Sequence, residues 1–283
     1  MIYFCADDYG VSEQSNNRIE ECLKNSVLNK ISVLPNGELG EFNNLISSDA
    51  VLSLHLNLVE GFPLSKQATV SLLTTKQGNF KYSFIGLFFA SLLPNRKELE
   101  KQLYLEIKNQ IDLWRSLVGE NKPILIDSHQ HTHMIPLIFK TLLKVIKDEN
   151  VQVESLRFPS EPIKPYVLTP SLYFKYGVSG LIKQWLLKIL GIINFKELKR
   201  AKINYALFMG VLFSGKMTED KIKKVLPKYL KIAEKHNLDI EIGLHPGYLQ
   251  KGESLIEGTR KDFNKFYLSP WRKKEFDNLL NFK

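Results

Sequence analysis

Cysteine is scarce in this chain of 283 residues, which contains only Cys5 and Cys22. Two cysteines form neither a disulfide framework nor a zinc ribbon, which excludes a disulfide-held secreted scaffold and indicates a reducing compartment. No apolar run reaches the roughly 20 residues that cross a bilayer. Met1 opens directly on a short, strand-like apolar run without a basic leader, so we expect a cytoplasmic protein.

Acidic residues are fewer than basic ones, 30 Asp and Glu against 39 Lys and Arg, and the formal net charge is +9 at pH 7. A positive field attracts phosphates, anionic lipid surfaces or acidic glycans. No recognition helix, zinc finger or RNA-binding motif accompanies the charge, so we expect no nucleic acid partner. A solvated basic surface is the simpler interpretation.

The chain also lacks internal repeats and low-complexity linkers, while 44% of its residues are hydrophobic, which is ample for a large core. Apolar runs alternate with amphipathic, helix-like stretches, and this alternation indicates a parallel sheet or barrel. Strands are predicted at residues 1–5, 30–34, 51–58, 123–126, 153–158, 202–208 and 239–244. Helices are predicted at about 12–25, 97–118, 137–147, 220–236 and 272–280.

Two adjacent carboxylates, Asp7 and Asp8, follow the first predicted strand. Like charges side by side repel each other, and one of them is driven toward protonation unless a cation intervenes. A divalent metal resolves the conflict if one Asp ligates it and the other stays free as a base. The competing interpretation is an ordinary acidic turn or a helix cap.

Five of the six histidines fall at the ends of predicted strands, namely His55, His129, His131, His133 and His245. Alternation along 51–58 puts His55 on the same face as Asn57. One carboxylate and two imidazoles leave coordination positions open for water and substrate, which is typical of a catalytic metal site. If the chain stays extended, His131 and His133 share the face of His129.

The stretch 178–195 is apolar almost all round, with interruptions at Lys183 and Lys188, and a basic run at 196–200 follows it. This pattern is typical of an interfacial membrane helix, and a buried helix or a contact with a second subunit in a homodimer are the alternatives. We expect the stretch to lie outside the barrel, as a wall beside the active-site mouth. Its basic flank would then meet a phosphate or the anionic headgroups of the inner membrane face.

Four segments at these strand ends resemble, in matching order, the motifs of the YdjC-like carbohydrate deacetylases. They are Ala-Asp-Asp-Tyr-Gly at 6–10, Leu-His-Leu-Asn-Leu-Val-Glu-Gly at 54–61, Asp-Ser-His-Gln-His-Thr-His-Met at 127–134 and His-Pro-Gly-Tyr at 245–248. That family includes chitooligosaccharide deacetylases and a hopanoid-biosynthesis-associated branch. Cys5 and Tyr9 stand where its members usually carry Asn and Phe, and neither change touches a ligand atom.

The resemblance implies an α/β fold, a distorted (β/α) TIM-like barrel, forming a single domain over 1–283 with helical insertions at about 62–122 and 162–202. It implies one divalent metal on Asp8, His55 and His129. Two histidines and a carboxylate suit zinc, whereas the family points to magnesium. The base would be Asp7 and the general acid His245.

Five further residues are expected to contact the substrate or to support the site: His131, His133, Arg157, Asn57 and Glu60. Of these, Arg157 is expected to orient the catalytic Asp7. The implied function is a metal-dependent hydrolase that removes an N-acetyl group from an amino sugar, in an oligosaccharide or a lipid-linked glycan. A metal-activated water, the Asp base and the His acid would perform it. The alternatives are a metal-dependent deformylase or phosphoesterase on the same fold, and a non-catalytic glycan or lipid binder.

Overall fold

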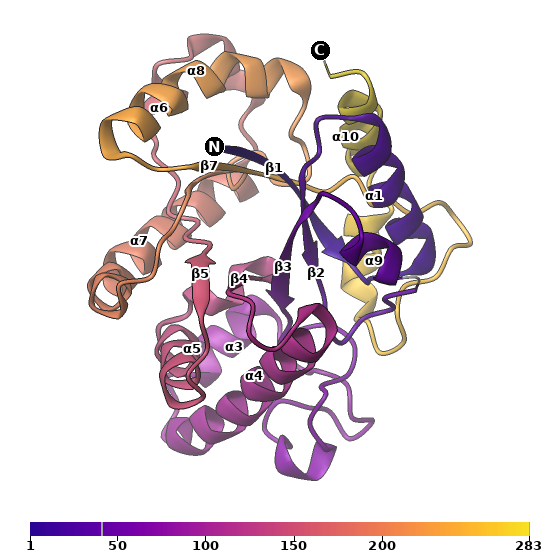
Figure 1. Ribbon diagram of the computed structural model, residues 1–283, viewed down its shortest axis with the longest axis vertical. Coiled ribbons are helices and arrows are strands. Elements are labelled where there is room, and N and C mark those ends of the chain that lie inside the picture. Colours follow the sequence, from indigo (N-terminus) through magenta and orange to yellow (C-terminus); the bar gives the residue numbers. More distant parts are fainter. Residues whose placement is uncertain (41, 283) are drawn as a thin grey trace.

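The computed structural model describes residues 1–40 and 42–282. Its strands are all parallel and form one seven-stranded sheet in the order β5-β4-β3-β2-β1-β7-β6, curled into a half-barrel (Figure 1). Isolated bridges from Ser155 to Asn204 and from Phe158 to Leu207 join the β5 side to the β6 side. The predicted α/β TIM-like barrel is therefore confirmed. The strands are β1 (Ile2–Tyr9), β2 (Lys30–Val33), β3 (Val51–Leu56), β4 (Ile124–Ser128), β5 (Val153–Leu156), β6 (Leu207–Met209) and β7 (Ile240–Leu244).

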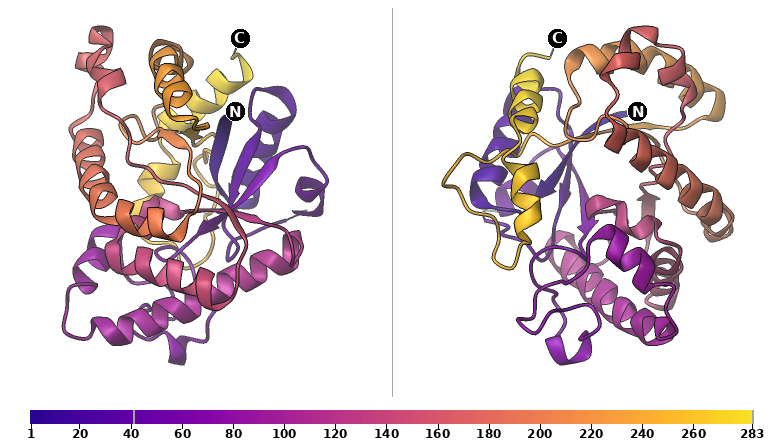
Figure 2. Two further views of the ribbon diagram at one scale, coloured as in Figure 1. Left: turned by 60° about the vertical axis from the view of Figure 1, so that its left-hand side comes forward. Right: turned by 180° about the vertical axis from the view of Figure 1, so that it is seen from behind.

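Helices surround the half-barrel (Figures 1 and 2). The α-helices are α1 (Glu13–Asn25), α2 (Phe42–Ile46), α3 (Phe84–Ala90), α4 (Arg96–Val118), α5 (Pro136–Asp148), α6 (Lys164–Val167), α7 (Val178–Ala201), α8 (Glu219–His236), α9 (Lys261–Tyr267) and α10 (Pro270–Leu280). The 3-10 helices are η1 (Gln67–Thr69), η2 (His129–Met134) and η3 (Pro170–Lys175). Helix α4 buries Leu99, Leu103, Ile107 and Ile111, the apolar stripe that predicted it.

The two stretches predicted as insertions lie between strands. Residues 62–122, between β3 and β4, contain η1, α3 and α4. Residues 162–202, between β5 and β6, contain α6, η3 and α7. Loops that follow strands at their carboxyl ends shape the active-site mouth of a barrel. Both insertions therefore leave the barrel at the end where the strand-end motifs lie.

The interior of the half-barrel is polar where β2, β3 and β4 lie side by side. The alternation predicted for β3 holds, because Leu54 and Leu56 join the apolar core while Ser53 and His55 point to the other side. There Ser53 Oγ lies 2.8 Å from Ser32 Oγ and donates to Asp127 at 2.8 Å. Barrels of this type are commonly filled by branched apolar side chains, so this polar filling is a departure that supports charged groups above it.

Three local predictions were wrong. β1 continues to Tyr9 instead of ending at residue 5, so the two aspartates belong to the strand itself. β6 begins later than the predicted 202–208, because α7 runs to Ala201 and Lys202 ends it in the left-handed conformation. The chain after β4 does not stay extended: Gln130 and His131 have φ of 54° and 59° inside η2. The shared face expected for the three histidines from 129 to 133 therefore does not exist.

Candidate active site

A backbone irregularity in β1 brings Asp7 and Asp8 to one cavity. In a regular strand, adjacent side chains point to opposite faces. The pairing of β1 with β2 shifts register between Ala6 and Tyr9, and Asp8 takes the left-handed conformation with φ of 71°. Both aspartates consequently line the same cavity. Such a conformation costs on the order of 1–3 kcal/mol in a non-glycine residue, so the contacts of Asp8 must hold it.

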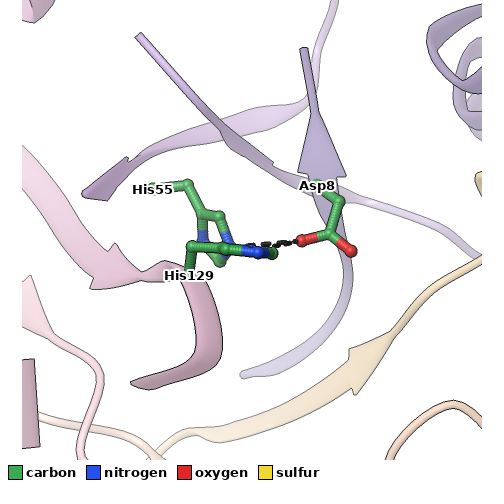
Figure 3. A group of neighbouring side chains, drawn as sticks. All are labelled: Asp8, His55 and His129. Carbon is green, nitrogen blue, oxygen red and sulfur yellow. Dashed lines mark hydrogen bonds and ion pairs between the residues drawn. The ribbon is translucent and has the colours of Figure 1, made fainter. Parts of the chain in front are cut away.

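Asp8, His55 and His129 form a buried group (Figure 3). Oδ1 of Asp8 lies 2.9 Å from Nδ1 of His129 and 3.5 Å from Nε2 of His55. One ligand atom from each residue lies within 4.8 Å of the others. The three side chains come from β1, β3 and the first residue after β4, so the parallel order of the strands brings them to one edge.

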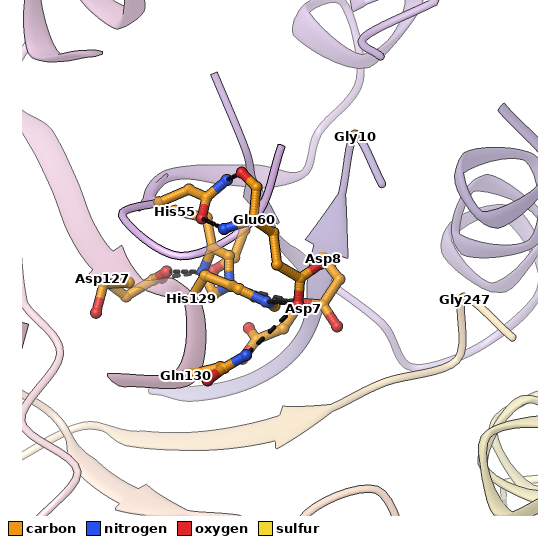
Figure 4. A network of polar contacts seen from close by, with 12 residues as sticks. Asp7, Asp8, Gly10, His55, Glu60, Asp127, His129, Gln130 and Gly247 are labelled. Carbon is orange, nitrogen blue, oxygen red and sulfur yellow. Dashed lines mark hydrogen bonds and ion pairs between the residues drawn. The ribbon is translucent and has the colours of Figure 1, made fainter. Parts of the chain in front are cut away.

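The remaining polar atoms of these three side chains are held by the protein (Figure 4). Nδ1 of His55 bonds to Asp127, and Nε2 of His129 lies 2.8 Å from Oε1 of Glu60. Oδ2 of Asp8 accepts a hydrogen bond from the buried guanidinium of Arg272 on α10. Metal-binding histidines are commonly held in this way, with one ring nitrogen on a carboxylate and the other on the metal.

A divalent cation fits this group. Ligand atoms about 2.1 Å from a metal stand roughly 3.0–3.4 Å apart, close to the spacings around Asp8 Oδ1. Within residues 1–40 and 42–282, no hydrogen-bond partner reaches the buried Nε2 of His55. Burial opposes protonation, yet Asp127 raises the pKa of His55 to about 9, and Glu60 with Asp8 raises that of His129 to about 10. The surrounding carboxylates thus attract positive charge to this point.

The hydrogen bond between Glu60 and His129 predicts a measurable effect on metal affinity. We expect Glu60→Gln to weaken metal binding by about 10- to 100-fold, because the ring of His129 loses the carboxylate that orients it. Titration calorimetry with Mg²⁺ and Zn²⁺ measures the change. Tyr267→Phe is the matched control, since Tyr267 donates to the other oxygen of Glu60 at 3.2 Å. Equal affinities in Glu60→Gln and wild type would contradict this support of His129.

Asp7 lies beside the group and is held by Arg157. The guanidinium donates from Nη1 to Oδ2 at 2.7 Å and from Nη2 to Oδ1 at 2.8 Å. Burial opposes ionisation, but Arg157 outweighs it and lowers the pKa of Asp7. Arg157 also contacts Glu241 and Asp127, so the guanidinium has further anionic partners inside the barrel. Asp7 is therefore an ionised and firmly oriented carboxylate in the cavity.

His245 follows β7 and lines the same cavity. Burial lowers the pKa of its imidazole to about 4. Oε2 of Glu275, on α10, lies 4.0 Å from Nδ1 of His245. The two carboxylate oxygens accept hydrogen bonds from the backbone N–H groups of His245 at 2.6 Å and Met217 at 2.5 Å. Burial raises the pKa of Glu275 to about 7, so this carboxyl exchanges its proton near neutral pH.

The other predicted residues divide between the cavity and the framework. His131 lines the cavity, with its ring edge-on to Phe208. His133 is buried, with Nε2 2.8 Å from the carbonyl oxygen of Arg157, and joins η2 to the end of β5. The Asn57 side chain accepts from the backbone N–H of Glu60 at 3.1 Å and donates to its carbonyl at 2.8 Å. Asn57 thus closes the turn that presents Glu60 to His129.

The cavity has a volume of about 540 Å³. Its polar end carries the carboxylates and imidazoles described above, and its walls are mainly apolar. Side chains from the start of α3, from the first half of α7, from the loop after β6 and from α9 form these walls. They include Phe84, Ile85, Ile182, Leu186, Leu187, Val211, Phe263 and Phe266. The predicted position of the apolar stretch 178–195 beside the site is thus borne out by the wall that α7 forms.

Sequence reasoning missed the contribution of the C-terminal helices. Arg272 and Glu275 stand one turn apart on α10 and reach Asp8 and His245. Their spacing was visible in the sequence, but nothing local placed that helix beside β1 and β7. Asp127 was visible too, as the residue that opens the third motif, and its role as the partner of His55 follows only from the pairing of β3 with β4.

The fold and this site together define an α/β barrel protein with a candidate metal centre at the carboxyl ends of its strands. The family model for the YdjC-like protein matches residues 1–281. The chain belongs to the YdjC-like family.

Curated relatives are 27–28% identical to this chain over the parts that align. A carbohydrate deacetylase from Clostridium beijerinckii is 28% identical over 65% of this chain and 73% of its own length. A carbohydrate deacetylase from Danio rerio is 27% identical over 55% of this chain and 49% of its own length. A chitooligosaccharide deacetylase from Escherichia fergusonii is 28% identical over 53% of this chain and 57% of its own length. The chain thus spans about half the length of two of these relatives.

A crystal structure from Enterococcus faecalis, provisionally named a cellobiose-phosphate cleavage protein, has the same fold. Its TM-score is 0.68 at 17% identity, over 99% of this chain and 90% of the other. At this identity the likeness bears on the fold alone.

Proposed function

We propose that the protein is a metal-dependent deacetylase that hydrolyses the N-acetyl group of an amino sugar. The observation that carries the proposal is the buried Asp8–His55–His129 group with the ionised Asp7 beside it in one cavity. The curated relatives named as carbohydrate deacetylases supply the substrate class. The reaction consumes one water and yields acetate and the free amine.

Asp8, His55 and His129 would hold the ion. When bound, a divalent cation would supply Lewis-acid activation of the water and of the amide carbonyl. We propose magnesium, in line with the family resemblance, while the two imidazoles and one carboxylate also suit zinc. Elemental analysis of the protein purified without added metal distinguishes the two.

Asp7 acts as the base in this proposal. Its carboxylate accepts the proton of the attacking water, and the two hydrogen bonds from Arg157 keep it ionised and aimed. Arg157 does so without losing its other partners, because Glu241 and Asp127 stay beside it in the barrel interior.

His245 acts as the acid toward the departing nitrogen. Its imidazole is neutral near pH 7, because burial lowers its pKa to about 4, so it must gain a proton before it can donate one. In this proposal Glu275, whose pKa burial raises to about 7, supplies that proton through a bridging water, because its Oε2 lies 4.0 Å from Nδ1 of His245, beyond hydrogen-bond distance. Glu275 therefore positions and charges the acid without touching the substrate itself.

Acetate release tests the proposed function directly. The metal-loaded protein is incubated with N-acetylated oligosaccharides and with N-acetylhexosamines linked through phosphate to lipids, and the products are weighed by mass spectrometry. We expect loss of one acetyl group per reacted sugar, abolished by a chelator and restored by metal. If only N-formyl analogues react and formate is released, the protein is a deformylase and not a deacetylase. If phosphate is released instead, the protein is a phosphoesterase.

The pair of Glu275 and His245 predicts a change in the pH profile. Because the reaction needs the protonated carboxyl, the wild-type rate should fall as pH rises through about 7. Glu275→Gln should lower turnover by roughly tenfold or more and remove this limb. A thermal melt controls for the two backbone hydrogen bonds that Glu275 accepts. A lower rate with an unchanged profile would make Glu275 a structural support only.

A further inference from the structure

Helix α7 is fixed to the barrel along one stripe. Five of its six buried residues recur at alternating steps of three and four: Gln184, Leu187, Gly191, Asn194 and Leu198; the sixth, Leu190, lies beside Gly191. A Cβ on Gly191 would lie 2.5 Å from Oγ of Ser160, so only glycine allows the helix to come this close. Nδ2 of Asn194 donates to the carbonyl oxygen of Met134 at 2.7 Å. These contacts hold α7 against the outside of the half-barrel.

The opposite stripe of α7 is apolar and faces solvent. More than half of each side chain is exposed at Val178, Ile182, Trp185, Ile189, Ile192 and Ile193. By length and composition α7 could cross a bilayer, so the expectation that no apolar stretch reaches that length was wrong, although one such helix is weak evidence for a membrane span. The stripe anchored through Gly191 and Asn194 instead makes α7 lie along the protein surface (Figure 2). An exposed apolar stripe of this size marks an interaction surface.

This outer stripe is continuous with the wall of the active-site cavity. Ile182 lines the cavity and is 63% exposed, and Ile85 of α3 lines it and is 51% exposed. Beyond Ile85, the segment after α3 exposes Leu92 and Leu93. An apolar chain that leaves the cavity therefore passes between the two helices onto a surface that is already apolar.

A basic side chain, that of Lys183, lies among these apolar side chains. Lys183 lines the cavity next to Ile182, on the first half of α7. Exposed basic residues continue along the helix at Lys196 and beyond, in a chain with a net charge of +9. A cation at an apolar wall fits a ligand in which an anionic group joins a polar head to a hydrocarbon chain.

We propose that the amino sugar is carried on a membrane lipid through a phosphate. The sugar lies at the carboxylates and imidazoles, the phosphate near Lys183, and the hydrocarbon chain between Ile85 and Ile182. The outer stripe of α7 rests on the membrane that holds the lipid. This inference rests on the proposed function, because it names the substrate class of the same site.

Vesicle co-sedimentation tests the membrane surface. We expect the wild type to bind vesicles of phosphatidylcholine with phosphatidylglycerol, more weakly at high salt. The double variant Ile189→Ser/Ile192→Ser, on the outer stripe, should bind at least about tenfold more weakly, since two exposed isoleucine side chains can no longer insert into the bilayer. Leu230→Ser, at an exposed position of α8, is the matched control and should bind like wild type. Equal binding by all three proteins overturns the proposal that the outer stripe of α7 rests on the membrane.

A charge change tests the basic flank. Lys196→Glu should weaken binding to the anionic vesicles at low salt and leave binding to phosphatidylcholine unchanged. Lys199 is less suitable, because its ammonium lies 5.3 Å from the ring of Phe195 and 5.6 Å from that of Tyr205. The proposal is overturned if the wild type binds no vesicles and is a dimer that becomes monomeric in the double variant. The outer stripe of α7 would then be the contact between two copies of this chain.

Two substrates with the same sugar separate this inference from the proposed function. One is an N-acetylhexosamine phosphate ester of a short polyprenol in vesicles, and the other is the water-soluble methyl ester. We expect kcat/KM at least about tenfold higher for the prenyl ester, and the α7 double variant to lose that advantage. Equal deacetylation of both esters overturns the lipid-carried substrate and leaves the proposed function standing. If neither ester loses its acetyl group while N-acetylated oligosaccharides do, this inference is overturned and the proposed function stands. If none of these three substrates is deacetylated, the proposed function is overturned and this inference with it.

Discussion

Asp8→Asn is expected to abolish both metal binding and deacetylation. The amide keeps the size of the side chain and an oxygen for Arg272, but its nitrogen cannot ligate a cation beside His55 and His129. Metal affinity should fall by more than about 100-fold, beyond the loss typical of residues that only support a ligand. Calorimetric titration with Mg²⁺ and Zn²⁺, followed by an acetate-release assay, measures both losses.

The control for this variant must show that the protein still folds. Asp8→Asn leaves the fully buried guanidinium of Arg272 without its anionic partner. Removing one partner of a buried ion pair lowers the free energy of unfolding by about 3–5 kcal/mol when the other charge stays unpaired. The ring faces of Phe266 and Tyr267, each 4.2 Å from the guanidinium carbon, remain to offset part of that cost. Asp277→Asn, on the exposed side of α10, is the matched control. Full metal affinity in a folded Asp8→Asn protein would remove Asp8 from the ligand set.

Asp7→Asn is expected to separate catalysis from metal binding. Turnover should fall by on the order of 100-fold or more, because an amide cannot accept the proton of the attacking water. Metal affinity should change only a few-fold, because the carboxylate of Asp7 is turned to Arg157 and does not belong to the Asp8, His55 and His129 group. The same titration and assay apply, so the two variants can be compared side by side.

The structure limits the side effects of this second variant. After Asp7→Asn, Arg157 still lies beside Glu241 at 2.5 Å and Asp127 at 3.3 Å, so its charge keeps anionic partners. Arg157→Lys is a useful companion, since a lysine cannot reproduce the two parallel hydrogen bonds to one carboxylate. If metal affinity falls as steeply as turnover in Asp7→Asn, then Asp7 is a ligand and the base lies elsewhere.

The sequence predicted which residues meet because parallel strands impose a simple rule. Polar side chains at or just after the ends of β1, β3, β4 and β7 must gather at the carboxyl edge of one sheet. Alternation along β3 was enough to turn His55 inward with Ser53. Their chemical roles stay predictions, since geometry alone does not assign a proton or an ion to a residue.

Backbone conformation at the site was beyond local reasoning. Asp8, Gln130 and His131 all have positive φ, although none of them is a glycine whose presence would have signalled it. Each conformation is held by contacts from elsewhere in the chain, such as Arg272 on Asp8. That is why the extended course predicted for the three histidines was wrong and why His133 ended in the framework instead of the cavity.

In helix α7, too, the sequence predicted the element, and packing against the barrel decided which of its faces is buried. Its apolar residues surround the helix, so no periodicity in the sequence distinguishes an inner from an outer stripe. The barrel made that distinction, because only the face with Gly191 and Asn194 can approach Ser160 and Met134 closely. The exposed stripe, and with it the surface proposed for a lipid-carried substrate, is what remains of the helix after that packing.

By itself, the sequence determined a parallel α/β fold and the set of strand-end residues that gather at one edge of its sheet, because strand and helix patterns are short-range and repeat regularly. The choice of a barrel over an open sheet came from the family resemblance. Tertiary structure decided how those residues are aimed and supported. Arg272 reaches Asp8 from 264 residues further along the chain, and Glu275 lies 30 residues beyond His245. Such contacts depend on how distant elements pack in three dimensions, and no pattern of neighbouring residues contains that information.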